Sequence, residues 1–297
     1  MSQAGRSQSA SAPAKVNLYL HVGPLKANGR HDLDSLVVFA EEPAADSLSV
    51  TASDTLGLEV EGPGARAAGP AGENLVLRAA KALRDASGTK QGALIRLRKV
   101  LPVAAGIGGG SSDAAAALRL LTELWNLDPA IAEAVAPGLG GDVPVALAGR
   151  AARMLGEGER VLPVKLPGSV PALLVNPGVA CPTGPVFAAH DAAGGGAGFG
   201  ELAQLPDFRT PDELAVWLGT QRNDLEAAAI GLVPEICALL DWLGMQPGVR
   251  LVRMSGSGAT CFALFGKLVD ARALEKQFRR DWPRGWAAAC MLGDAVA

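Results

Sequence analysis

Aromatic residues make up only 4% of this 297-residue chain, and its three histidines and four cysteines are scattered without a Cys-x-x-Cys pair. These absences argue against a zinc site and a disulfide framework, and they predict reduced thiols. No stretch approaches the ~18 uninterrupted apolar residues of a membrane helix. Residues 1–13 lack the cationic start and apolar core of a signal peptide. We therefore expect a cytoplasmic protein without a membrane partner.

An excess of charge of one sign is also lacking, because 27 basic residues stand against 30 acidic residues with no long run of either kind. We therefore expect no nucleic-acid partner, although a net charge of -3 is compatible with a small anion bound by backbone groups. The chain is rich instead in apolar residues, at 49%, and in glycine (37) and proline (20). This length and apolar content suffice for two domains with buried cores.

Hydrophobic periodicity, interrupted by glycine and proline, predicts strands and helices of an α+β protein. Strands are expected at residues 15–22, 36–40, 47–51, 56–60, 94–100 and 172–175, and as a strand, turn and strand over 249–266. Helices are expected at 74–84, from about 113 to 125, at 212–218 and at 234–243. Prolines and a glycine at 164–171 mark a boundary, so we expect a flexible N-terminus over 1–12 and domains over 13–165 and 166–297.

A glycine-rich loop precedes the helix expected from about Asp113, with Gly106 and Gly108–Gly110 followed by Ser111 and Ser112. Glycine lets several backbone N–H groups point at one spot, and a helix N-terminus adds unpaired donors, so the pattern favours phosphate binding. The serines could cap the helix, contact phosphate or help to hold Mg²⁺. A flexible loop before a capped helix, without a ligand, fits the same residues.

Several classes of phosphate-binding protein are excluded by what this loop lacks. There is no Gly-Lys-Ser/Thr of a Walker A loop and no HRD or DFG of a protein kinase. The dinucleotide fingerprint fails at its last glycine, where Ser111 stands.

Three motifs in order resemble those of the GHMP superfamily of galacto-, homoserine, mevalonate and phosphomevalonate kinases: PAKVNL at 13–18, PVAAGIGGGSSDAAA at 102–116 and MSGSGAT at 254–260. Within it, the chain resembles the kinases of 4-diphosphocytidyl-2-C-methyl-D-erythritol, through PAKVNLYLHV, NGRHDLDSLVVFA, Glu73-Asn74-Leu75, GGDVP and Asn223-Asp224-Leu225. The resemblance implies an ATP-binding N-terminal domain like ribosomal S5 domain 2, a ferredoxin-like C-terminal domain and a substrate cleft between them.

The same resemblance implies a reaction. ATP, with Mg²⁺, would phosphorylate the 2-hydroxyl of the cytidyl substrate in non-mevalonate isoprenoid synthesis. Asp142 would be the base, and the Lys15 ammonium would lie beside it and the acceptor hydroxyl. From the sequence alone, Asp142 also fits a helix N-cap after two glycines, and Lys15 also fits an edge lysine that reaches solvent.

For the cytidyl substrate, the resemblance implies that Asn17 contacts the erythritol part, which fits its place two residues after Lys15 on one strand face. His31 would recognise cytosine by hydrogen bonds, and Thr183 would bind the diphosphate. Phe187 would stack on cytosine, although it also fits core packing. Arg30 stands where the family normally has a stacking tyrosine; a guanidinium plane can stack as well.

The implied ATP site is the loop Pro102, Val103, Ala104, Ala105, Gly106, Ile107, Gly108, Gly109, Gly110, Ser111 and Ser112, with Asn74 and Lys99 at the adenine. Lys99 also fits a solvated strand residue. No acidic Mg²⁺ ligand is evident, so we expect ATP and water to hold the metal, with Ser112 as a candidate. The segment 256–260 is expected to approach the loop closely, to form a hairpin turn, or both.

Two other functions stay open from the sequence. One is another small-alcohol kinase of the superfamily, of homoserine or mevalonate type. The segments at His31 and Phe187, which are expected to bind cytosine, disfavour it. The other is a non-catalytic nucleotide or sugar sensor on the same fold, against which the presence of both Lys15 and Asp142 speaks.

Overall fold

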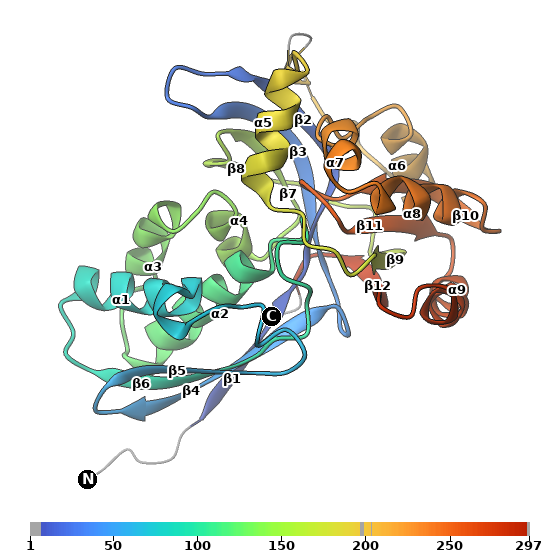
Figure 1. Ribbon diagram of the computed structural model, residues 1–297. Coiled ribbons are helices and arrows are strands. Elements are labelled where there is room, and N and C mark those ends of the chain that lie inside the picture. The colour runs from blue at the N-terminus through green and yellow to red at the C-terminus, as the bar shows by residue number, and fades with distance from the viewer. Residues whose placement is uncertain (1–6, 197–198, 203, 296–297) are drawn as a thin grey trace.

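Two β-sheets organise the chain in the computed structural model, which describes residues 7–196, 199–202 and 204–295 (Figure 1). The four-stranded sheet has the order β1 (Gln8–Pro13), β4 (Ala45–Ser53), β6 (Gly92–Arg98) and β5 (Leu56–Glu61). The eight-stranded sheet has the order β10 (Val249–Met254), β11 (Cys261–Phe265), β9 (Val170–Asn176), β12 (Trp286–Gly293), β3 (His31–Ala40), β7 (Ala152–Gly156) and β8 (Arg160–Pro163), with β2 (Lys15–Leu25) paired to β3.

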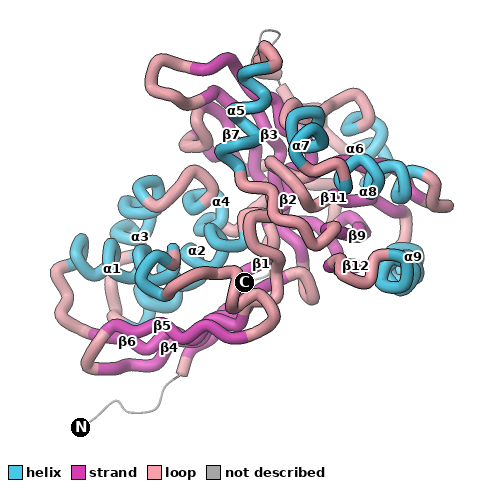
Figure 2. The backbone as a smooth tube through the Cα atoms, in the orientation of Figure 1, coloured by secondary structure: helices cyan, strands magenta, loops and turns pink. Residues whose placement is uncertain are grey.

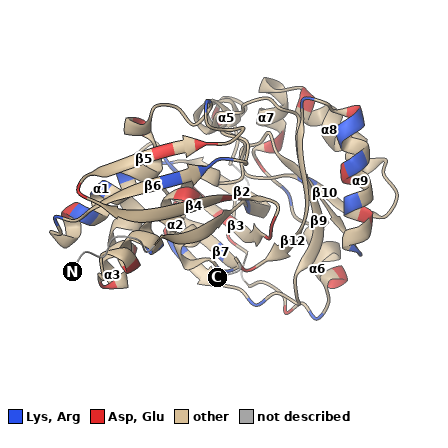
Figure 3. Ribbon diagram, turned by 90° about the horizontal axis from the view of Figure 1, so that it is seen from below, with Lys and Arg blue, Asp and Glu red and all other residues tan. Residues whose placement is uncertain are grey.

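Helices pack against both sheets. They are α1 (Leu75–Ser87), α2 (Gly109–Leu124), α3 (Pro129–Val135), α4 (Val143–Ala148), α5 (Thr183–Ala192), α6 (Pro211–Leu218), α7 (Glu226–Leu232), α8 (Glu235–Gly244) and α9 (Leu268–Asp281), with 3-10 turns at Ala71–Glu73 and Ala136–Gly138. Within the described residues, none of the helices is both long and apolar enough to span a membrane. Basic and acidic residues are interspersed along the ribbon, as on α9 (Figure 3).

The four-stranded sheet is covered on one face by α1 and α2, and α3 packs against these two helices (Figure 1). The side chains of Leu48 and Val50 in β4 and of Ile95 and Leu97 in β6 alternate along their strands and pack with helix residues in one core. Alanines fill the start of α2, and a residue this small lets the helix lie close to the sheet. This packing fixes the N-terminus of α2, which is the end that faces the glycine-rich loop.

The eight-stranded sheet is buried on both faces. In β9, Ala172 and Leu174 pack into one core with β2, β3 and α6, whereas Leu173 and Val175 pack into another with α7, α8 and α9. Since successive strand residues point to opposite faces, a continuous apolar run such as 170–175 is what such a strand requires. The sheet joins residues from both sides of the expected boundary, because β12 pairs with β3 at Leu292 and Gly293.

All the expected elements are present, mostly longer than expected, and several others went unnoticed. The expectation of a flexible N-terminus over 1–12 is wrong for residues 8–12, because β1 pairs with β4 from Gln8 to Pro13; residues 1–6 lie outside the described ones. Helix α2 begins at Gly109 and not near Asp113, since glycine and serine here adopt helical geometry after Gly108. The boundary proposed at 164–171 covers the loop between β8 and β9 and the first two residues of β9.

A buried ion pair ties the second sheet together. Arg153 Nε and Nη2 donate to the two carboxylate oxygens of Asp34 at 2.9 and 2.7 Å, and the Tyr19 hydroxyl donates to the same carboxylate at 2.6 Å. Burial alone would raise the pKa of Asp34, but hydrogen bonds from Arg153, Tyr19 and the Leu202 N–H hold it below its usual value. The Asp34 carboxylate is thus charged, and its hydrogen-bond partners stabilise that charge against the cost of burial.

We expect Arg153→Met to lower the free energy of unfolding by about 3–5 kcal/mol, because it leaves a buried carboxylate without its cation. Urea unfolding measures this loss. The double variant Asp34→Asn/Arg153→Met leaves no buried charge behind and should be more stable than Arg153→Met alone. If the double variant is instead the less stable of the two, the ion pair does not account for the loss.

Candidate active site

A cavity of about 460 Å³ is lined by the loop between β6 and α2 and by strands of the eight-stranded sheet. The backbone of this loop is drawn in pink between β6 and α2 in Figure 2. The cavity is lined by Lys15, Asn17, Leu20, Leu33, Ser35, Ala68, Glu73, Asn74, Leu75, Lys99, Pro102 to Ser111, Asp113, Asp142, Met154, Thr183, Phe187, Leu225, Gly256 and Ser257. The structure therefore brings together the expected catalytic residues, Asn74, Lys99, Asn17, Thr183, Phe187 and the loop from Pro102 to Ser111. Ser112, Arg30 and His31 are not among the residues that line it.

The loop is held by backbone hydrogen bonds from three other segments. The N–H groups of Lys15, Cys181 and Thr260 donate to Ile107, Ala104 and Ala105 carbonyls at 2.9, 2.9 and 3.1 Å. These hydrogen bonds fix the backbone of the loop, so that its other backbone groups are held in position at the cavity.

Glycine is required where this loop meets the segment 254–260. Gly106 has φ +73°, and a Cβ there would stand 2.3 Å from the Ser255 carbonyl oxygen. On the other side, a Cβ on Gly256 would stand 2.5 Å from the Gly106 oxygen. The turn between β10 and β11 therefore forms both the expected hairpin turn and the expected close support of the loop.

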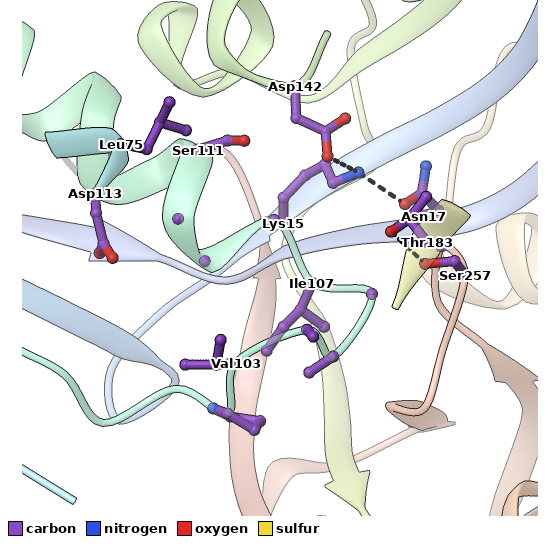
Figure 4. A pocket seen from close by; sticks show the side chains of 18 of the residues that line it. Lys15, Asn17, Leu75, Val103, Ile107, Ser111, Asp113, Asp142, Thr183 and Ser257 are labelled. Atoms are coloured by element: carbon purple, nitrogen blue, oxygen red, sulfur yellow. Dashed lines mark hydrogen bonds and ion pairs between the residues drawn. The ribbon is translucent and has the colours of Figure 1, made fainter. Parts of the chain in front are cut away.

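Lys15, Asp142 and Asn17 form one polar cluster at the cavity (Figure 4). The Lys15 ammonium is 2.9 Å from Asp142 Oδ2 and donates to Asn17 Oδ1 at 2.9 Å. Lys15 is only 5% exposed, so it is not an edge lysine in solvent. Asp142 stands before α4, yet its side chain makes no capping hydrogen bond. Both side chains thus take the arrangement that the family resemblance implies.

The neighbours of this cluster hold it in place. Asn17 Nδ2 donates to Ser35 Oγ at 2.7 Å, and the Ser35 hydroxyl donates to the Tyr19 carbonyl at 2.6 Å. The Asn17 N–H donates to Ser255 Oγ at 3.1 Å. With its amide oriented from both sides, Asn17 keeps its oxygen on the Lys15 ammonium.

Phe187 lines the far end of the cavity and packs on His31, with ring centroids 5.0 Å apart and planes at 30°. His31 is buried behind it. Its Nδ1 lies 2.8 Å from the Gly23 carbonyl oxygen, so Nδ1 carries the hydrogen, and Nε2 is 3.5 Å from Asp191 Oδ2. Thr183 Oγ1 and Ser257 Oγ are 2.9 Å apart across the cavity wall.

Arg30 lies outside the cavity, at the tip of the β2–β3 hairpin. Its side chain is 69% exposed, and Nη1 is 3.4 Å from Glu157 Oε2. The same carboxylate accepts from Lys26 Nζ and Asn28 Nδ2, each at 2.7 Å. Arg30 is thus one partner of an exposed cluster.

Asn74 and Lys99 have structural roles beside the cavity. Asn74 caps α1, since its side-chain oxygen accepts the Val76 N–H. Lys99 is not a solvated strand residue: it is 4% exposed and pairs with Asp46 and Asp113 at 2.5 and 2.7 Å. Burial alone would lower the pKa of Lys99, but the two carboxylates raise it. Burial raises the pKa of Asp113, and the Lys99 ammonium opposes this rise.

Sequence reasoning missed several lining residues. Ser257 carried a signal, since it stands inside the MSGSGAT motif. Asp113 stands directly after the serine pair, where the sequence predicts only the start of a helix. Asp46 does not line the cavity but bonds Lys99, which does, and the sequence held no signal for it because it comes near the cavity only through the pairing of β4 with β6.

Comparison with known proteins agrees with this geometry. Residues 74–150 match the GHMP kinases N terminal domain, and residues 201–284 match GHMP kinases C terminal. A 4-diphosphocytidyl-2-C-methyl-D-erythritol kinase of Hyphomonas neptunium is 62% identical over 297 residues, which cover 99% of this chain and 100% of that protein. This chain belongs to the 4-diphosphocytidyl-2-C-methyl-D-erythritol kinases of the GHMP family. A 4-diphosphocytidyl-2-C-methyl-D-erythritol kinase of Cereibacter sphaeroides is 48% identical, over 93% of this chain and 96% of that protein.

Solved structures agree on the fold. A crystal structure of a 4-(cytidine 5'-diphospho)-2C-methyl-D-erythritol kinase superposes with a TM-score of 0.75 at 37% identity, covering 96% of this chain and 99% of that one. Homoserine kinase from Cytophaga hutchinsonii superposes with a TM-score of 0.65 at 16% identity, over 99% and 97% of the chains, and shows the fold alone. The predicted two-domain α+β GHMP kinase fold is confirmed.

We expect Gly106→Ala to lower kcat/KM for ATP by more than about tenfold, because the new methyl group displaces the Ser255–Gly258 turn and strains a left-handed residue by about 1–2 kcal/mol. Steady-state kinetics with varied ATP and thermal unfolding measure the two effects. Gly231→Ala is the matched control, since residue 231 lies inside α7 and the Cβ added there would have nothing within 4 Å. Equal kinetics for the two variants would contradict the proposed contact.

Proposed function

We propose that this chain transfers the γ-phosphoryl group of ATP to the 2-hydroxyl of 4-diphosphocytidyl-2-C-methyl-D-erythritol. The observation that carries the proposal is the Lys15–Asp142–Asn17 cluster beside the N-terminus of α2, in which Lys15 and Asn17 are buried and Asp142 is half-buried. It supplies a carboxylate and a cation next to a phosphate-binding loop, which is what phosphoryl transfer to an alcohol requires. The identities of 62% and 48% to kinases named for this substrate support it.

In the proposed reaction, Asp142 accepts the proton of the 2-hydroxyl while the oxygen of that hydroxyl forms a bond to the γ-phosphorus. The bond between that phosphorus and the β,γ-bridging oxygen breaks, and ADP leaves. Lys15 holds Asp142 in place and favours the alkoxide by its charge. Asn17 accepts a hydrogen bond from Lys15 on the other side. We propose that the erythritol part of the substrate lies next to the Asn17 amide.

We propose that ATP lies along the loop from Pro102 to Ser111, with its adenine near Asn74 and Lys99. Phosphate oxygens would accept from the N–H groups at the start of α2, where the helix dipole favours negative charge. Mg²⁺ would neutralise phosphate charge. We propose that this ion is bound through phosphates and water. Ser112, the candidate side chain from the sequence, has a buried hydroxyl without a hydrogen-bond partner, but it does not line the cavity.

The cytidine end is proposed to lie at Phe187. The Phe187 ring offers a stacking face, and Thr183 is near enough to the loop to meet the diphosphate. His31 would contribute through Nε2, since Nδ1 is committed to Gly23.

Release of ADP by the purified protein, given ATP, Mg²⁺ and the cytidyl substrate, tests the function. We expect turnover with this substrate and little with homoserine or mevalonate. Equal turnover with homoserine or mevalonate would favour another kinase of the superfamily. Tight ATP binding without turnover on any of these alcohols would favour a sensor.

Asp142→Asn should lower kcat by about 10²–10⁴-fold, because the amide cannot accept the proton. The Kd for ATP should stay within a factor of about two, since Asp142 donates nothing to the phosphates. Single-turnover kinetics and calorimetry measure the two quantities. Loss of ATP binding would show that Asp142 has a structural role instead.

Arg30→Tyr should leave the KM for the cytidyl substrate unchanged or lower it, because the exposed Arg30 gives up only a long contact to Glu157. A tyrosine supplies the ring that the family normally places here. Lys26→Met is the control, since it removes another partner of Glu157 without adding a ring. A large rise in KM for Arg30→Tyr alone would mean that Arg30 binds the substrate in another way, such as through phosphate.

A further inference from the structure

Three buried charges beside the ATP loop take no part in the proposed proton transfer. Lys99 lies between Asp46 and Asp113, and the three side chains, which we call the Lys99 triad, are 4%, 0% and 3% exposed. Removing charges from water is costly unless they are well paired, so these residues are closely constrained in position. The triad connects β4, the end of β6 and α2.

One side of the triad fixes where the ATP loop begins. Asp46 Oδ1 accepts the N–H groups of Val100 and Leu101 at 2.5 and 2.8 Å, directly before Pro102. Its other oxygen, Oδ2, accepts from Lys99. Asp46 thereby sets the direction in which the chain leaves β6 and enters the loop.

The other side of the triad fixes where the loop ends. Asp113 stands four residues after Gly109, so the two share one face of α2. The Lys99 ammonium lies along that face, 2.7 Å from Asp113 Oδ2 and 3.1 Å from the place of a Cβ on Gly109. A cation at a helix N-terminus is repelled by the helix dipole, and the Asp113 carboxylate offsets that repulsion.

We infer that Asp46 and Asp113 are positioning residues for ATP. Asp46 holds the start of the loop through the Val100 and Leu101 N–H groups, and both carboxylates hold Lys99 against the first turn of α2, where the amides would meet the phosphates. The inference rests on the proposed function. Lys99 and Asp113 line the cavity beside the loop, whereas Phe187 and Thr183 line it from α5.

Two variants of Asp113 test the inference. Asp113→Ala should raise the KM for ATP about tenfold, as expected for loss of one hydrogen bond between charged groups. Asp113→Asn keeps an oxygen acceptor for Lys99, so it should raise this KM by less, about threefold. The KM for the cytidyl substrate should stay within about twofold of the wild type in both variants. The conservative Asn variant carries the test if the Ala variant does not fold.

Asp34→Asn is the matched control, since it also removes a carboxylate from a buried ion pair but bonds no part of the loop. It should lower Tm and leave the KM for ATP unchanged. An unchanged KM for ATP in both Asp113 variants would overturn the inference. So would a parallel rise in both KM values with a drop in Tm like that of Asp34→Asn, which marks a merely structural role.

Calorimetric titration with MgATP separates this inference from the proposed function. If the wild type binds MgATP but does not turn over the cytidyl substrate, the proposed function fails. The inference is then tested by the Kd values for MgATP alone. In that case Asp113→Ala should weaken the Kd about tenfold and Asp113→Asn less. Equal Kd values for all three proteins would overturn the inference by itself.

Discussion

The contact between the ATP loop and the segment 254–260 is the constraint on which the rest of the site depends. Backbone meets backbone there, because Gly106 and Gly256 each leave no space for a Cβ against the other segment. Ser255 strengthens the contact, since its hydroxyl accepts the Asn17 N–H and donates to the Gly106 carbonyl. One serine in the β10–β11 turn therefore joins β2 and the loop, although Ser255 lies 238 residues from Asn17 and 149 residues from Gly106 in the sequence.

This arrangement explains how a chain with a net charge of -3 can be suited to two phosphate-rich substrates. The positive potential comes from oriented amides and a helix N-terminus rather than from many basic side chains. The two lysines at the loop are each held by carboxylates, Lys15 by Asp142 and Lys99 by Asp46 and Asp113. A sequence with few surplus cations is therefore no argument against phosphate chemistry.

The sequence predicts those parts of the site whose geometry is set by neighbouring residues. It does not predict the parts that depend on pairing between distant segments. The glycine-serine loop and the Lys15–Asn17 spacing carry their geometry within a few residues, and both appear as expected. Asp46 reaches the site only through a β4–β6 register that no local pattern shows. Strand β12, with three successive alanines, lacks the β-branched residues typical of a strand, and tertiary packing on α9 overrides that weak propensity. Strand β1 is missed for the same reason, because its small polar residues become ordered only against β4.

The first turn of α2 shows why glycine has to be dense there. Gly108 would place a Cβ 3.1 Å from Lys15 Cε, and Gly109 would place one 3.1 Å from Lys99 Nζ. Two ammonium side chains therefore flank the same helical turn, one on the side of the proposed acceptor hydroxyl and one on the side of the adenine. Any larger residue at either position would push one of these cations away from its carboxylate. The glycines thus do more than free the backbone for phosphate: they leave the space in which both ion pairs can reach the helix start.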